Sequence, residues 1–120
     1  MRSIQNKHHK LEYDPSTHHV QFSGELDLGT AEEYEPLLLL LKEAVDASTD
    51  EKLIINLRPL KFINSSAINM LGKFAYYARE QKATVCLQGY SSVRWQRKLL
   101  GNLKRAVSSI ETELSKPESQ

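Results

Sequence analysis

The sequence predicts one α/β domain in which a four- or five-stranded mixed sheet carries helices on one side. An apolar run at residues 53–57 precedes a helical pattern over residues 66–81 and a second apolar run at residues 83–88. This is the order of a βαβ unit, which places two strands in parallel through a right-handed crossover. A chain of 120 residues suffices for one hydrophobic core but not for two.

The N-terminal part of the chain predicts a hairpin. We expect residues 1–9 to form a flexible polar lead and residues 10–13 to form a short strand. Residues 14–17, with the sequence DPST, favour a turn, because proline presets φ and Asp or Ser side chains bond the local backbone. Residues 20–26 then alternate between apolar and polar, which is typical of a half-buried strand.

The first helix is expected after Thr30. Thr30 and Glu33 have the spacing of a capping box, in which each side chain satisfies a free amide of the first turn. Pro36 either bends this helix or marks its real start, because proline removes a helical hydrogen bond. The apolar positions follow a helical period: Tyr34, Leu37, Leu38, Leu41 and Val45.

The second helix, residues 66–81, is expected to bury Ile68, Leu71, Ala75 and Ala78. Gly89 is expected to end the 83–88 strand. A third helix over residues 91–100 is expected to end at Gly101, since glycine suits the left-handed cap.

The C-terminal part leaves two alternatives open. Ile110, Thr112 and Leu114 alternate, which favours a closing edge strand, whereas residues 103–107 are equally consistent with one more helical turn. We expect the domain to span residues 10–114 and residues 115–120 to form a disordered tail.

Composition excludes several classes of protein. The formal net charge of +1 and the lack of a nucleic-acid motif give no reason to expect a nucleic acid partner. The single cysteine, Cys86, cannot form an internal disulfide, and the longest apolar run, residues 37–41, is far below the ~20 residues of a membrane span. We therefore expect a cytoplasmic protein without a membrane partner.

No enzyme signature is recognisable. The glycines are scattered, without a Walker or dinucleotide pattern, and no G-x-S-x-G elbow is present. The pairs His8-His9 and His18-His19 are expected to be exposed hairpin residues, because neighbours on a strand point to opposite faces and rarely chelate a metal. No metal, no cofactor and no catalytic activity are expected.

Residues 64–67, with the sequence NSSA, follow a buried strand and begin a helix, the position at which α/β proteins gather functional groups. Asn and Ser are also good helix caps, which is the simpler interpretation. The second interpretation is phosphorylation, because a phosphate at a helix start meets free amides and the positive end of the dipole.

Two segments of this sequence resemble the STAS domain of bacterial anti-sigma factor antagonists. One is FINSSA at residues 62–67, between an apolar strand and an amphipathic helix; the other is FSGELD at residues 22–27, ahead of the Thr30 helix. The resemblance covers roughly residues 10–114. It implies binding to a serine kinase that is also an anti-sigma factor, with a PP2C-type phosphatase reversing the phosphorylation.

Mapped by motif, the resemblance makes Ser65 the phosphoacceptor and Ser66 the fallback. It assigns partner binding to the surrounding positions: Glu25, Asp27, Thr30, Asn64, Ser66 and Ala67. This chain has Asn64 where the family has Asp, and Ala67 where the family has Gly. Two alternatives to the phosphorylation switch stay open: a non-phosphorylated scaffold that forms oligomers, and a small nucleotide-binding protein.

Charge is uneven along the chain. An acidic stretch covers residues 25–35, and a basic stretch covers residues 94–105. Such runs are usually solvated helix faces, but opposite potentials also steer partner proteins together.

Overall fold

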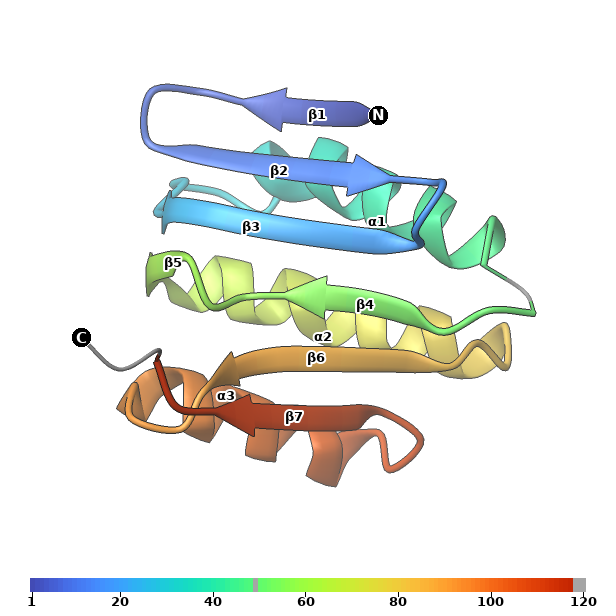
Figure 1. Cartoon of the computed structure of the whole chain (residues 1–120). Coiled ribbons are helices and arrows are strands. Elements are labelled where there is room, and N and C mark those ends of the chain that lie inside the picture. Colours follow the sequence, from blue (N-terminus) through green and yellow to red (C-terminus); the bar gives the residue numbers. More distant parts are fainter. Residues whose placement is uncertain (49, 118–120) are drawn as a thin grey trace.

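The computed structural model describes residues 1–48 and 50–117, which fold into a seven-stranded sheet with three α-helices (Figure 1). The strands are β1 (Arg2–Gln5), β2 (His9–Asp14), β3 (His19–Leu26), β4 (Leu53–Asn56), β5 (Leu60–Ile63), β6 (Val85–Tyr90) and β7 (Glu111–Ser115). The helices are the 3-10 helix η1 (Glu32–Tyr34) and the α-helices α1 (Glu35–Asp46), α2 (Ser65–Glu80) and α3 (Arg94–Ala106).

The sheet is mixed, as expected. Its order is β1-β2-β3-β4-β6-β7, with β5 paired to the end of β3. The β1–β2 and β2–β3 pairs are antiparallel, whereas β3–β4, β4–β6 and β6–β7 are parallel. The β4–α2–β6 segment is therefore the predicted βαβ unit.

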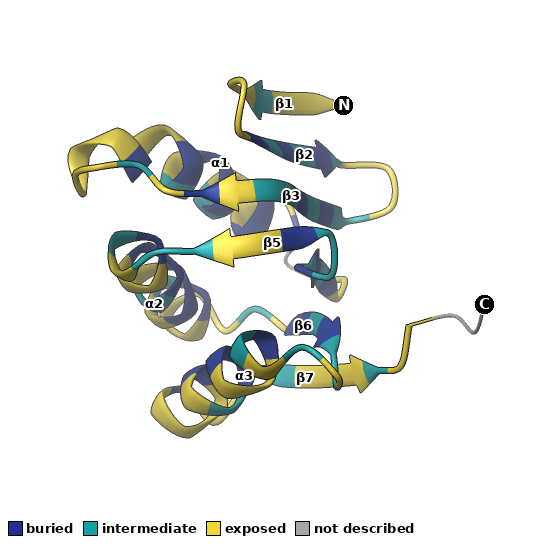
Figure 2. Cartoon of the chain, turned by 90° about the vertical axis from the view of Figure 1, so that its left-hand side faces the viewer, coloured by how far each residue is buried: buried dark blue, intermediate teal, exposed yellow. Residues whose placement is uncertain are grey.

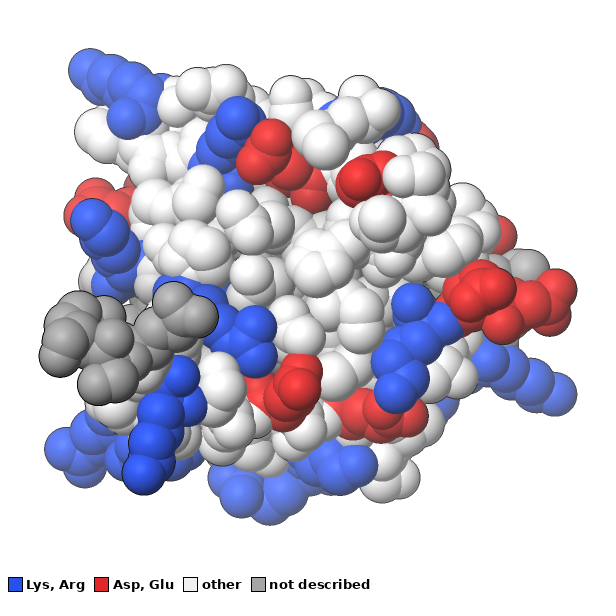
Figure 3. Space-filling model, viewed as in Figure 1, with Lys and Arg blue, Asp and Glu red and all other residues white. Residues whose placement is uncertain are grey.

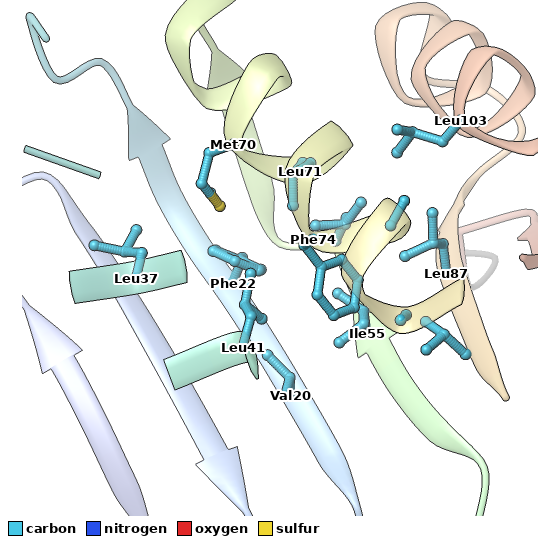
Figure 4. Packing of buried hydrophobic residues seen from close by; sticks show 14 of the residues in the cluster. Val20, Phe22, Leu37, Leu41, Ile55, Met70, Leu71, Phe74, Leu87 and Leu103 are labelled. Carbon is cyan, nitrogen blue, oxygen red and sulfur yellow. The ribbon is translucent and has the colours of Figure 1, made fainter. Parts of the chain in front are cut away.

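All three α-helices cover the same face of the sheet, and the other face is open. Figure 2 shows α1, α2 and α3 in one layer, with their buried sides toward the strands. The sheet and helices together enclose one core. Figure 4 shows Phe22 of β3, Ile55 of β4, Leu41 of α1 and Phe74 of α2 in this layer, and each is at most 1% exposed.

The sheet has more strands than the four or five expected, because β1 and β5 were not predicted. β1 lies inside the expected polar lead, residues 1–9, and of its residues only Ile4 is half-buried. β5 lies between the expected strand and the expected second helix, in residues 58–64, where we expect a short loop from the sequence; it has four residues, directly after Pro59. The closing edge strand is present as β7. Residues 118–120 of the expected tail lie outside the described residues.

The start of α1 agrees with one of the two expectations for Pro36. A single 3-10 turn precedes the α-helix, which begins at Glu35, so Pro36 lies in the first turn, where its missing N–H costs nothing. Half of the expected capping box is present: Thr30 Oγ1 accepts from the Glu33 N–H at 3.3 Å, but the Glu33 carboxylate accepts from the Thr30 hydroxyl at 3.2 Å and, among the described residues, not from a backbone amide. Leu40 is buried in place of Leu38 on the predicted stripe.

Three positions differ from the sequence prediction. Gly89 lies inside β6 and does not end it, and α3 continues through Gly101 to Ala106, so the additional helical turn exists together with β7. Ile68 was expected in the core but is 43% exposed, because Met70 and Phe74 fill the buried side of α2.

Gln96 joins α3 to the middle of the sheet. It is 0% exposed, and its Nε2 donates to the carbonyl oxygens of Leu57 at 3.0 Å and Leu60 at 3.1 Å. Its Oε1 accepts from the Tyr90 N–H at 2.7 Å. The turn between β4 and β5 is therefore held by a helix that lies more than 30 residues further along the chain.

Candidate functional site

Two parallel strands end together beside the start of α2. Leu26, the last residue of β3, is in register with Ile63, the last residue of β5. The Asn64 N–H donates to the Leu26 carbonyl oxygen at 3.0 Å. This places the loop after β3, including Asp27, against the first turn of α2. The two segments of the STAS resemblance are therefore neighbours in space.

Gly24 makes this arrangement possible. β3 pairs with β4 at residues 19–21 and with β5 at residues 24–26, and the register shifts between Gly24 and Glu25. Gly24 has a φ of 87°, and a Cβ there would lie 2.2 Å from the backbone oxygen of His8. Only glycine tolerates that conformation and that contact, so it is required where β3 changes partner.

Asn64 connects three segments, which together form the Asn64 network. Its Oδ1 accepts from the Ala67 N–H at 3.0 Å and from the Tyr34 hydroxyl at 2.9 Å. Its Nδ2 donates to the Leu28 carbonyl oxygen at 2.7 Å and lies 3.4 Å from a carboxylate oxygen of Asp27. An aspartate here could still cap the helix, but it could not donate to Leu28. The asparagine that departs from the family pattern therefore matches its surroundings.

Tyr34 is the residue of this network that sequence reasoning assigned only to the core. Its ring is 1% exposed, and its hydroxyl accepts from the Leu28 N–H at 3.1 Å while donating to Asn64. Burial raises the pKa of the Tyr34 phenol, so the hydroxyl stays protonated and remains a donor. A tyrosine in an apolar helical stripe was the available signal, because a buried phenol needs a hydrogen-bond partner.

The two candidate serines lie at the first two positions of α2. Ser65 is exposed, and Ser66 is half-buried. Asn64, not a serine, is the N-cap, and in the described part of the chain neither serine hydroxyl contributes to the cap. A group added to Ser65 would therefore reach solvent without uncapping the helix.

The other predicted binding residues differ in accessibility. Glu25 and Asp27 are exposed, and Thr30 is exposed and bonded to Glu33. Ala67 is 0% exposed and belongs to the hydrophobic core, so its side chain cannot contact a partner. The exposed candidates thus lie at the end of β3, in the loop after it and in the first turn of α2.

A groove of about 990 Å³ crosses the helical face and begins at Ser66. Residues of α1, α2 and α3 line it. Three of them are large hydrophobic side chains with high exposure: Leu39 at 58%, Tyr76 at 45% and Ile68 at 43%. Sequence reasoning missed this groove, because it depends on how three helices pack.

Charges are distributed differently on the two faces. On the open face of the sheet, oppositely charged groups lie beside each other (Figure 3), in the pairs Lys10–Glu12, Lys52–Glu111 and Arg58–Glu113. The groove instead contains Lys42, Lys73 and Lys98 together with Glu32 and Glu35, and none of these forms an ion pair within the described residues.

The histidines and the cysteine do not form a second site. His8 is exposed as expected, but His9 is 5% exposed because β2 turns it toward the helical side, and His18 and His19 are half-buried. In residues 1–48 and 50–117, no three His, Cys, Asp or Glu side chains gather as metal ligands would. Burial raises the pKa of the Cys86 thiol, which keeps it protonated and unreactive.

None of the helices in the described residues has the length and apolarity that crossing a membrane requires.

Comparisons with known proteins identify similar folds. The family model of the STAS domain matches residues 10–105. Apo-SiaC from Pseudomonas aeruginosa superposes with a TM-score of 0.71 at 13% identity, covering 96% of this chain and 99% of that chain. A second structure, SiaC of Pseudomonas aeruginosa, gives 0.75 at 14% identity, covering 98% and 100%.

A third similar structure is described as diguanylate cyclase SiaD in complex with its activator SiaC, from the same organism. Its matching chain gives a TM-score of 0.70 at 15% identity, covering 94% of this chain and 100% of that chain. A search of the curated proteins found no match.

Proposed function

Because the chain belongs to the STAS domain family, we propose that it is a cytoplasmic bacterial regulator that binds partner proteins, has no catalytic activity of its own, and is switched by phosphorylation of Ser65. The observation that carries this proposal is an exposed serine at the start of α2, next to a helix cap that is supplied by Asn64. Ser66 is the fallback acceptor.

The position favours a switch that leaves the fold intact. A phosphate on Ser65 would add about −1.5 to −2 charges at the positive end of a 16-residue helix, where negative charge is stabilising. The Asn64 network would remain in place, since its hydrogen bonds use no serine hydroxyl. The phosphate would therefore change the surface and not the core.

The proposed docking surface consists of Glu25, Asp27, Thr30, Asn64 and Ser66. A phosphate beside Asp27 would give this surface a strong local negative potential. A partner whose contact residues are apolar or acidic would lose affinity, because like charges across an interface are destabilising.

Two kinds of partner fit the proposal. The family resemblance favours a serine kinase of the anti-sigma factor type, with a PP2C-type phosphatase that restores the serine. The similarity to SiaC supports a second kind, because SiaC is described as the activator of a diguanylate cyclase. In either case this chain acts by binding another protein.

The test begins with protein isolated from its native cell. We expect intact mass and phosphopeptide mapping to find phosphate on Ser65 under some growth conditions. Purified Ser65→Asp should lose the partner that Ser65→Ala retains in a pull-down followed by mass spectrometry. Its free energy of unfolding should be no lower than that of the wild type, because a carboxylate at a helix start is favourable.

Ser92→Asp is the matched control, because Ser92 is also exposed and lies just before the start of α3. It should retain the partner. If phosphate were absent under all growth and stress conditions and Ser65→Asp bound as well as Ser65→Ala, the switch would be wrong. A stable oligomer of the wild type in that case would favour the non-phosphorylated scaffold.

A further inference from the structure

A straight row of three residues marks the outer surface of α2. Ile68, Gly72 and Tyr76 are spaced at four-residue intervals, so they lie above one another on the same side of the helix. Ile68 is 43% and Tyr76 is 45% exposed. Gly72 between them has no side chain, which leaves a notch between two apolar groups on the wall of the groove.

The chain itself does not explain Gly72. Among residues 1–48 and 50–117, a Cβ added there would have no atom outside its own helix within 4 Å. Glycine inside a helix is less stable than alanine, because it loses more backbone entropy on folding. The free protein would therefore be more stable with a larger residue at position 72, so the open notch requires an explanation outside this chain.

We propose that the groove binds one amphipathic helix of a partner protein, with an apolar side chain of that helix seated over Gly72 between Ile68 and Tyr76. This inference rests on the proposed function, since it describes how the partner is held. The notch allows the two helices to approach closely at one point. Leu39 supplies further exposed apolar surface on α1, across the groove.

The charges of the groove indicate the chemistry of that helix. The groove contains three lysines, Lys42, Lys73 and Lys98, and two glutamates near the start of α1, Glu32 and Glu35, and none of these five forms an ion pair in the described chain. The cationic groups are therefore in excess. An apolar stripe flanked by Asp and Glu would place its carboxylates against these ammonium groups. The concave shape favours a helix over a flat membrane surface, because residues of α1 and α3 line the groove together with those of α2.

The location of the groove also connects it to the serines. Ser66 lies at one end of the groove, and Ser65 precedes Ile68 by three residues on the same side of α2. A phosphate at this end would face an acidic-flanked helix and repel it. The same occupant therefore accounts for the groove and for the direction of the proposed switch.

Two leucine substitutions test the notch. Gly72→Leu fills it, whereas Gly101→Leu changes a helical glycine of α3 outside the groove, where the nearest neighbour of an added Cβ is the flexible end of Arg105 at 3.8 Å. Both should raise the unfolding temperature, because leucine is the better helix former. Only Gly72→Leu should affect binding.

The probe is a synthetic helical peptide of roughly 18 residues, about five turns, with a leucine stripe flanked by glutamates. A second peptide has lysines in place of the glutamates. Binding to the unphosphorylated protein is measured by calorimetry and by amide chemical shifts. We expect the acidic peptide to change the backbone amide chemical shifts of Ile68, Gly72 and Tyr76. Gly72→Leu should weaken it by at least about tenfold, Gly101→Leu should leave it unchanged, and the lysine peptide should bind at least about tenfold more weakly.

Four outcomes would overturn the inference. The acidic peptide could fail to bind, or both peptides could bind with equal affinity. The chemical shift changes could be confined to the open face of the sheet, or Gly72→Leu could leave the affinity for the acidic peptide unchanged. Anionic phosphatidylglycerol vesicles that bind the wild type but not Gly72→Leu would assign this face to a membrane instead. Self-association in sedimentation that disappears in Gly72→Leu would assign it to a second copy. All of these are independent of Ser65, so the inference and the switch can fail separately.

Discussion

Asn64 and Gln96 do similar chemistry in opposite surroundings. Each is an amide whose oxygen accepts a backbone N–H and whose nitrogen donates to carbonyls of a distant segment. Gln96 is 0% exposed and lies between α3 and the sheet. Asn64 is half-buried and is followed by an exposed serine.

The difference shows how the fold separates stability from regulation. Around Gln96 there is no spare space, since a Cβ on Gly89 would lie 3.3 Å from the Gln96 Oε1. Around Asn64, water can replace a lost contact and a new group on Ser65 can reach solvent. A buried amide thus holds the turn between β4 and β5, while a surface amide orients a loop that is free to be modified.

The largest effect on stability is expected from removing the buried amide side chain of Gln96. Gln96→Ala leaves the Leu57 and Leu60 carbonyls and the Tyr90 N–H without this partner. The Leu57 oxygen keeps the Leu60 N–H as a donor at 3.0 Å, so the Leu60 carbonyl and the Tyr90 N–H are the groups left unsatisfied. Each unsatisfied buried group costs about 1–3 kcal/mol, and we expect a loss of about 3 kcal/mol in the free energy of unfolding. Urea unfolding measures it. Arg94→Ala, at an exposed position of the same helix, should stay within about 0.5 kcal/mol, and a similar loss in both variants would contradict this assignment.

A smaller effect on stability is expected from removing the half-buried amide side chain of Asn64. Asn64→Ala removes the cap of α2 and the contact to Leu28, and we expect a loss of about 1–2 kcal/mol, near the usual value for a helix cap. The free energy of unfolding of Asn64→Asp should lie between those of the alanine variant and the wild type, because aspartate still accepts from the Ala67 N–H but cannot donate to the Leu28 carbonyl oxygen. Urea midpoints rank the three proteins, and a loss for Asn64→Ala as large as that of Gln96→Ala would remove the distinction between the two amides.

The smallest effect is expected at the phenol that joins the surface network. Tyr34→Phe should cost about 1 kcal/mol, the usual net value of a hydrogen bond. The folded protein favours the neutral phenol, because burial raises the pKa of Tyr34. The contribution of the neutral Tyr34 phenol to the free energy of unfolding is therefore complete below about pH 10, the pKa of a tyrosine in the unfolded chain. It is lost as the pH rises above that value. Urea midpoints from pH 8 to 11 should fall more steeply for the wild type than for Tyr34→Phe, and parallel curves would contradict this.

Sequence patterns identified the parts of the fold that have strong periodicity. The run at residues 53–57 and the helical pattern at residues 66–81 correspond to β4 and α2, since a buried strand and an amphipathic helix are visible in composition alone. β1 and β5 have four residues each, too few for a period to be recognised, and β5 directly follows Pro59, so both depend on neighbouring strands that sequence patterns do not show. Gly89 and Gly101 were misjudged as ends because glycine is also used inside elements.

The site was predictable in outline but not in its contacts. Asn64, Ser65 and the loop after β3 were placed together by the family motifs, and the register of β3 with β5 brings them side by side. The roles of Tyr34 and Gln96 were not predictable, because their partners lie some 30 residues or more away in sequence. The groove and the notch at Gly72 required the packing of three helices.

The two outer strands of the sheet have a consequence for the protein at high concentration. The outer edges of β1 and β7 carry backbone groups that no strand of the described chain pairs. Such edges recruit other chains unless they are short or charged. β1 has only four residues, and β7 carries Glu111 and Glu113 and is followed by Pro117. A second β7 strand laid on this edge would have to accommodate these charged side chains and their ion pairs, which opposes the growth of sheets from one molecule to the next.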